Sequence, residues 1–200
     1  MKFSIAILTL SAIFTSASGL VEAQEKTPDY YPFKVGTKWR YQVDSGNGNK
    51  IPIINEVAEI EKIDDQSLAR IETSVNGKLA ATEHMSQTKQ GLFRNRFNGA
   101  KVSPPIQLLK FPIKKGEKWE SETSIAGQQI SVKCAVDLEE IEVAAGKFKA
   151  VKVIVDASQA GGGISTTYWF ADNVGIVKQT VDINGQKVVI DLEKMEPPKE

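Results

Sequence analysis

The sequence is poor in the residue types that carry most enzyme and metal chemistry. Its 200 residues include one cysteine, Cys134, and one histidine, His84. A single cysteine excludes an intramolecular disulfide, and one Cys with one distant His cannot supply the usual zinc ligands. A Ser-His-Asp or Cys-His arrangement would have to use His84, and no Gly-x-Ser-x-Gly motif accompanies it. We therefore expect a non-enzymatic protein without a metal or cofactor, although a hydrolase using carboxylates from distant strands stays open.

The sequence also lacks a charge of either sign in excess. It has 25 basic and 25 acidic residues, which gives no electrostatic reason to expect nucleic acid or an anionic membrane as a partner. Adjacent carboxylates such as Glu139 and Glu140 point to opposite faces of a strand and do not form a catalytic pair. Charge therefore favours no particular function class.

Long hydrophobic runs are absent except at the start of the chain. Lys2 precedes a mostly apolar stretch, and Val21-Glu22-Ala23 fits a small-x-Ala cleavage site. The apolar stretch of about ten residues is shorter than the roughly twenty that cross a bilayer. We expect a signal peptide at 1–23, no lipid anchor, and a single β domain at 24–200 with no transmembrane segment. The expected location is periplasmic or secreted.

What the chain does contain is two-residue alternation. Trp39, Tyr41 and Val43 fall on one side of an extended run, and a second apolar row runs from Ile130 through Cys134 to Leu138. Successive strand residues point to opposite faces, so these runs predict strands with one buried face. Cys134 belongs to the apolar row, which indicates a buried structural role.

Turn signals separate the extended runs at short intervals. Asn76-Gly77 and Asn184-Gly185 predict two-residue hairpins, because both residues tolerate the positive φ that such turns need. This interpretation also accounts for Asp182 to Gly185, which otherwise resembles a fragment of a calcium loop. The chain is expected to be all-β and antiparallel, with about ten strands forming a curved sheet, an open barrel or a sandwich.

One segment of the chain has a partner eighty residues later. "YPFKVGTKWRY" at 31–41 matches "FPIKKGEKWES" at 111–121. The match predicts an internal duplication, with half 1 at about 30–97, a connector at 98–110 and half 2 at about 111–195. Pro104-Pro105 is expected to interrupt any strand in that connector. Trp39 and Trp119 then become the predicted core anchors of the two halves.

Four residues are weak candidates for ligand contact: Tyr41, Arg94, Arg96 and Tyr168. Arg94 and Arg96 are expected on one face, which would suit an anionic ligand, although a solvated strand face is the commoner meaning. Tyr41 has no counterpart in the second tryptophan segment. Tyr168 aligns with His84, which is expected on the polar face of its strand.

Three stretches resemble small bacterial exported proteins of unknown function: "GKFKAVKV" at 146–153, "TTYWFADNVGIVKQ" at 166–179 and "YPFKVGTKWRY" at 31–41. In those proteins a strand ending in Tyr-Trp-Phe-Ala turns into Val-Gly-Ile-Val-Lys. The resemblance implies an antiparallel β fold and an extracytoplasmic location, and it brings no catalytic or binding residue.

Two hypotheses of function follow. The first is an exported module that binds an apolar, lipid-like or amphipathic ligand in the concavity of its sheet. The second is a structural component of the cell envelope, or one that interacts with an envelope protein. The sequence cannot separate a filled interior from a ligand cavity.

Overall fold

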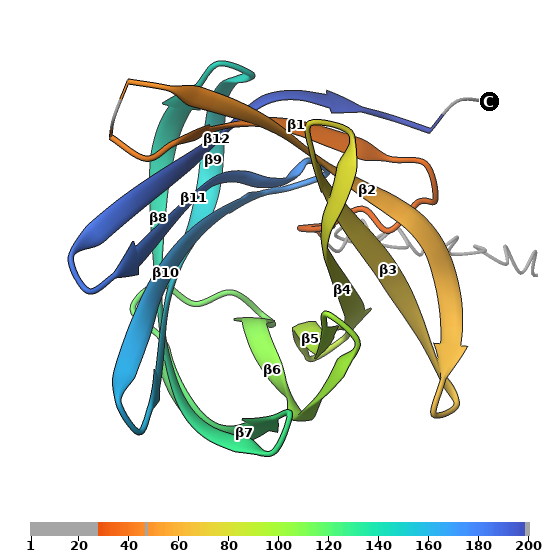
Figure 1. Cartoon of the computed structure of the whole chain (residues 1–200), viewed down its shortest axis with the longest axis vertical. Coiled ribbons are helices and arrows are strands. Elements are labelled where there is room, and N and C mark those ends of the chain that lie inside the picture. The colour runs from red at the N-terminus through yellow and green to blue at the C-terminus, as the bar shows by residue number, and fades with distance from the viewer. Residues whose placement is uncertain (1–27, 47, 199–200) are drawn as a thin grey trace, which may run out of the picture.

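The described residues form a closed antiparallel β-barrel. In this computed structural model the structure describes residues 28–46 and 48–198. Each strand pairs with its neighbours in the chain, and β12 pairs with β1 to close the ring. Figure 1 shows the blue β12 running beside the orange β1 at this closure. Closure leaves neither β1 nor β12 as a free edge.

Twelve strands make up the barrel in this part of the chain. They are β1 (Lys38–Asp44), β2 (Lys50–Ile63), β3 (Gln66–Val75), β4 (Lys78–Thr88), β5 (Gly91–Phe97), β6 (Ala100–Lys110), β7 (Lys118–Ile125), β8 (Gln128–Val143), β9 (Gly146–Gln159), β10 (Gly162–Ala171), β11 (Gly175–Ile183) and β12 (Gln186–Glu196).

The two predicted Asn-Gly hairpins are confirmed. Asn76 and Gly77 have φ of 51° and 74°, and Asn184 and Gly185 have φ of 53° and 85°. Each pair joins strands whose last paired residues are directly adjacent to the turn. Positive φ at both central residues matches the twist of the flanking strands, which is why Asn-Gly is favoured here. Three further two-residue turns have the same signs of φ: Asp64-Asp65, Asn98-Gly99 and Ala126-Gly127.

The all-β antiparallel class is confirmed, whereas the expected details were wrong. The sheet has twelve strands rather than about ten, and it closes instead of forming an open barrel or a sandwich. Closure depends on the pairing of β1 with β12, for example Tyr41 opposite Leu192. Such long-range pairing has no local sequence signal.

The expected connector at 98–110 is also corrected, because most of it is β6. Its ladder to β7 contains only two residue pairs, Val102 with Ile125 and Ser103 with Ser124. Pro104 and Pro105 follow directly, and proline has no N–H to donate to a ladder. The prolines therefore end the pairing with β7 without ending the strand.

Side chains join β6 to β7 where the ladder stops. Thr123 Oγ1 donates to the carbonyl oxygen of Pro104 at 2.6 Å. Trp119 Nε1 donates to the carbonyl oxygen of Gln107 at 3.1 Å. This seam between β6 and β7 is the most weakly paired strand junction of the described barrel.

The two tryptophan segments have the same backbone arrangement. Gly36 N donates to Val57 O at 2.8 Å, and Val57 N donates to Thr37 O at 3.0 Å. The second segment repeats both bonds at 2.9 Å, from Gly116 N to Val136 O and from Val136 N to Glu117 O. Duplication of the complete halves remains a prediction.

The core lies inside the barrel, towards the end where the N-terminal segment 28–37 enters. Trp39 is fully buried and lies 4.9 Å from Tyr31, ring centroid to ring centroid. Cys134 is buried, as its place in the apolar row predicted. Trp119 is half-buried and packs against the core rather than lying within it.

Candidate ligand-binding sites

A charged cluster occupies the interior of the barrel. The Arg94 guanidinium donates to both carboxylate oxygens of Glu83, at 3.1 and 3.2 Å, and to the Tyr168 hydroxyl oxygen at 3.2 Å. Arg94 lies on β5 and Tyr168 on β10, which are not neighbours in the sheet. The bond between them therefore crosses the interior, and we call Glu83, Arg94 and Tyr168 the interior cluster.

The expectation that Arg94 and Arg96 share a face was wrong. The register between β4 and β5 shifts, so that His84 faces Arg96 while Met85 faces Arg94. The shift leaves Asn95 as an extra residue on β5, which is a β-bulge. Arg94 consequently points inward with Met85, and Arg96 lies on the outer wall.

Within the interior cluster, Arg94 and Glu83 form an ion pair. Burial alone would lower the pKa of Arg94, but the charge of Glu83 and hydrogen bonds to Tyr168 and Glu83 together raise that pKa above its ordinary value. Tyr31 lies beneath the cluster, and burial followed by the charge of Glu83 raises the pKa of its hydroxyl. Arg94 is thus cationic and Tyr31 neutral at any physiological pH.

Tyr41, another candidate, is fully engaged by the protein. Its side chain is buried, and its hydroxyl donates to the carbonyl oxygen of Ile176 at 2.9 Å. Burial raises the pKa of this hydroxyl well above its ordinary value. In this arrangement Tyr41 ties β1 to β11 from inside the barrel and has no exposed surface for a ligand.

Inward-facing apolar side chains remain exposed at the end of the barrel opposite the N-terminal segment 28–37. Ile51 faces Val43, in the same row as Tyr41, and is 43% exposed. Ile164 and Ile183 face each other, in the same row as Tyr168, and are 45% and 44% exposed. Inward-facing apolar residues in a filled barrel would be buried.

Phe97 completes this set and connects it to the interior cluster. It faces Glu83 across the β4–β5 ladder and is 38% exposed. The Arg94 guanidinium carbon lies 5.9 Å from the centre of its ring. We call Ile51, Phe97, Ile164 and Ile183 the apolar mouth. All four lie within a few residues of hairpin turns, where alternation does not distinguish an inner from an outer face.

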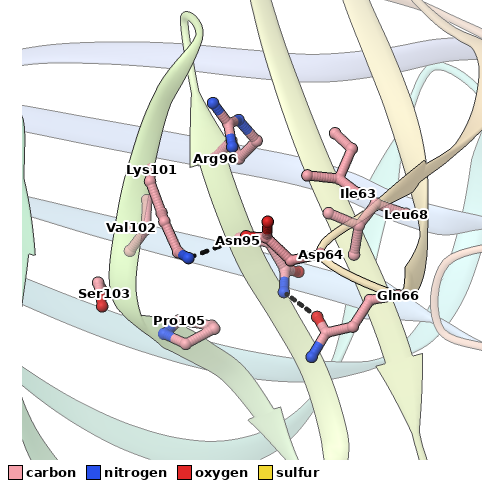
Figure 2. Close-up of a pocket in the computed structure, with 10 residues that line it drawn as sticks. All are labelled: Ile63, Asp64, Gln66, Leu68, Asn95, Arg96, Lys101, Val102, Ser103 and Pro105. Carbon is pink, nitrogen blue, oxygen red and sulfur yellow. Dashed lines mark hydrogen bonds and ion pairs between the residues drawn. The ribbon is translucent and has the colours of Figure 1, made fainter.

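A separate pocket of about 230 Å³ lies on the outer wall, between the β2–β3 turn and strands β5 and β6. Figure 2 shows Lys101 reaching Asp64 from one side and Asn95 joined to Gln66 on the other. Arg96 stands at one edge of the same pocket (Figure 2). Its apolar lining comes from Ile63, Leu68, Val102 and Pro105. We call it the hairpin pocket.

A second pocket, of about 420 Å³, adjoins the first. The two share Gln66, Asn95 and Pro105 in their walls. Seven of the nine residues that line the second pocket carry an amide or a hydroxyl group, and Phe93 is its aromatic residue. The two pockets together are called the outer groove. The sequence did not indicate it, because the residues come from five strands and are joined only by folding.

His84 lies on the polar outer face, as predicted, opposite Arg70 and Arg96, but it is buried there. Its Nε2 is 3.0 Å from Glu61 Oε2, and Glu61 Oε1 is 2.7 Å from Arg70 Nε. The other ring nitrogen, Nδ1, is buried without a hydrogen-bond partner in the described part of the chain. A carboxylate that orients a histidine is typical of a general base. Nδ1 is closed to solvent, however, so the geometry offers no path for a substrate.

Other chemistry is sparse in residues 28–46 and 48–198. No group of three or more His, Cys, Asp or Glu side chains there could hold a metal ion. Asp182 Oδ1 accepts from Gly185 N at 2.8 Å, which confirms the hairpin interpretation of that segment. Within the same ranges no helix is long and apolar enough to cross a membrane. The predicted signal peptide lies outside the described residues.

Comparisons with known proteins establish the fold. No family model and no curated protein matches the chain. Two solved structures are similar. One is a candidate exported protein with a YmcC-like fold from Bacteroides fragilis, with a TM-score of 0.53. The other is a candidate lipoprotein from Parabacteroides distasonis, with a TM-score of 0.50. Each is 13% identical, and each match covers 86% of this chain and 100% of the other. At this identity the likeness shows a shared antiparallel β fold alone.

Proposed function

We propose that this protein is a non-enzymatic, exported β-barrel that binds an apolar or amphipathic ligand at its apolar mouth. The observation that carries the proposal is the exposure of Ile51, Phe97, Ile164 and Ile183 on inward-facing positions. Apolar surface left in contact with water at the opening of a barrel gains free energy when a ligand covers it, by about 25 cal/mol per Å². Barrel mouths are common locations of such sites.

The layers beneath the mouth suit an amphipathic ligand. Below Phe97 lies the interior cluster, where Arg94 and Tyr168 offer a cation and a hydroxyl. Below the cluster the buried rings of Trp39 and Phe170 fill the barrel. A ligand would therefore enter only to the depth of the cluster, with its apolar part against the mouth and a polar group towards Arg94.

An extracytoplasmic location is part of the proposal. The apolar stretch and the Val21-Glu22-Ala23 sequence support export. The similar structures carry the descriptions of a lipoprotein and an exported protein, which agrees with this location. The expected cleavage after Ala23 can be checked by the mass of the protein recovered from outside the cytoplasm.

The test of ligand binding is native mass spectrometry and solvent extraction of the protein recovered from outside the cytoplasm, followed by titration with 1-anilinonaphthalene-8-sulfonate. We expect a co-purified apolar molecule or saturable dye binding. Replacing Ile164 or Ile183 by Ser should weaken dye binding by about tenfold, because each removes apolar contact area worth roughly 1.5 kcal/mol.

Leu138→Ser is the matched control. Leu138 is equally exposed, at 46%, but lies nearer the other end of its strand, beside Tyr30. The Leu138→Ser variant should bind the dye with the same affinity as the parent protein. A clean apoprotein that binds no dye would overturn the ligand proposal and leave the alternative, a structural or interaction component of the envelope.

A further inference from the structure

The outer groove has an excess of positive charge at one end. Arg96 and Lys101 line the hairpin pocket together with a single carboxylate, Asp64. Lys101 Nζ is 2.9 Å from Asp64 Oδ2. The Arg96 guanidinium makes one hydrogen bond within the described protein, at 2.8 Å to the carbonyl oxygen of Gly99. Its other N–H groups can meet the carboxylate of a ligand, for which the planar guanidinium is well matched.

The other end of the groove is uncharged and rich in hydrogen-bonding groups. Seven of nine lining residues in the larger pocket carry amides or hydroxyls. Asn95 Nδ2 and Gln66 Oε1 are 3.4 Å apart, which is a long hydrogen bond that a ligand can replace. A ligand hydroxyl group can take the place of this contact, because it both donates and accepts hydrogen bonds.

Phe93 and Pro105 add apolar surface to this polar wall. A ring with an apolar face and many hydroxyl groups satisfies both kinds of lining at once, because amide side chains donate and accept hydrogen bonds. That combination describes a sugar. A lipid would leave the amide groups of the groove without hydrogen-bond partners. The apolar mouth, which suits an apolar ligand, lies on the inner face of the barrel and is not part of this groove.

An extended peptide fits the groove less well. Peptides that add to a sheet pair with an unpaired edge strand. Strands β3, β4 and β5 at the groove are paired on both sides, and β6 is paired with β5 on either side of a gap at 102–105. On its other side, the side chains of Trp119 and Thr123 bind the carbonyl groups of β6. Recognition here must therefore use side chains, which favours a ligand rich in hydroxyl groups over a polypeptide backbone.

We propose that the outer groove binds an acidic saccharide, with the sugar rings along the larger pocket and a carboxylate at Arg96. Lys101, whose Nζ is 2.9 Å from Asp64 Oδ2, is the second cation of the site. The site is on the outer wall and is independent of ligand binding at the apolar mouth.

The test uses two disaccharides that differ by one carboxylate. N-acetylglucosaminyl-N-acetylmuramic acid carries a lactyl group, which N,N′-diacetylchitobiose lacks. Titration of the ¹⁵N-labelled full-length protein should produce saturable amide shifts at residues 64–68, 86–90 and 93–96. The acidic disaccharide should bind at least about fivefold more tightly, because a charge-assisted hydrogen bond forms at Arg96.

Arg96→Gln should abolish that difference while leaving the binding of diacetylchitobiose unchanged. Lys101→Gln should reduce the difference, whereas Lys133→Gln, which removes an equally exposed lysine on β8, should not. Equal affinity for both sugars, absence of saturable shifts, or a preference that survives Arg96→Gln would each overturn the proposal. Tight binding of lactate alone would also overturn it, because the groove would then be a simple anion site.

Discussion

The indole nitrogen of Trp39 donates a 2.6 Å hydrogen bond to the carbonyl oxygen of Val174, which joins the start of β1 to the turn between β10 and β11. The residue after Val174 is Gly175, with φ of 102°, and a Cβ there would lie 3.1 Å from Trp39 Nε1. The close approach of the indole therefore requires both the positive φ and the missing side chain of glycine. This contact packs the tryptophan segment against the hairpin between β10 and β11.

Replacing Trp39 by Phe should lower the free energy of unfolding by about 2–4 kcal/mol. The change removes the hydrogen bond, leaves the Val174 carbonyl unsatisfied and opens a space in a fully buried site. Trp119→Phe should lower it by only about 1–2 kcal/mol, because that ring is half-buried. Urea denaturation of both variants measures the difference.

The two variants also differ in where they loosen the barrel. Trp119 joins β6 to β7 where the backbone ladder is missing, so Trp119→Phe should increase hydrogen exchange at the β6–β7 seam. Trp39→Phe should not affect exchange at that seam selectively. Equal losses of stability with identical exchange patterns would contradict the distinct roles given to the two residues.

The interior cluster should show strong energetic coupling. Glu83→Gln or Arg94→Met alone should lower the free energy of unfolding by about 3–5 kcal/mol, because each leaves an unpaired charge in the interior. The double variant should lose clearly less than the sum, since neither charge remains. A double-mutant cycle by urea denaturation measures this coupling, and additive losses would show that the pair is not buried as an ion pair.

Local chemistry in the sequence was sufficient to predict the strands and hairpins. The row of Trp39, Tyr41 and Val43 and the turn at Asn76-Gly77 each involve neighbours in the chain. Closure of the barrel was not predictable, because the pairing of β1 with β12 joins residues about 150 positions apart. Pro104-Pro105 misled the prediction, since these prolines end only the pairing with β7, while β6 continues and pairs with β5 as far as Lys110.

The candidate sites show the same limit. Arg94 was a candidate, but alternation placed it with Arg96 because a one-residue bulge at Asn95 leaves no sequence signal. The outer groove combines residues from five strands, β2 to β6, and from the β2–β3 turn. Glu61 is 23 residues from His84, and only the folded sheet brings the two together.

Cys134 should be inert in the folded protein. Burial, followed by the charge of Asp156, raises the pKa of its thiol to about 12. The thiolate is the reactive form, so alkylation by iodoacetamide at pH 8 requires the protein to open. We expect labelling of the native protein to be at least about a thousandfold slower than in 6 M guanidinium chloride, and rapid native labelling would contradict a buried, structural role.

Stability in acid should depend on Glu196 at the end of β12. Hydrogen bonds from Arg40 and Lys194 lower the pKa of this carboxyl from 4.5 to about 2. A lowered native pKa stabilises the fold above the pKa of the unfolded chain, and that contribution is lost as pH falls through the native pKa. The melting temperature should therefore decline between pH 4.5 and 2, and Glu196→Gln should make that decline shallower while lowering the melting temperature at pH 7.

Glu122→Gln, which removes an exposed carboxylate on β7, controls for net charge and should leave the slope unchanged. Equal slopes in the Glu196→Gln variant and the parent protein would show that the contacts with Arg40 and Lys194 do not persist in solution.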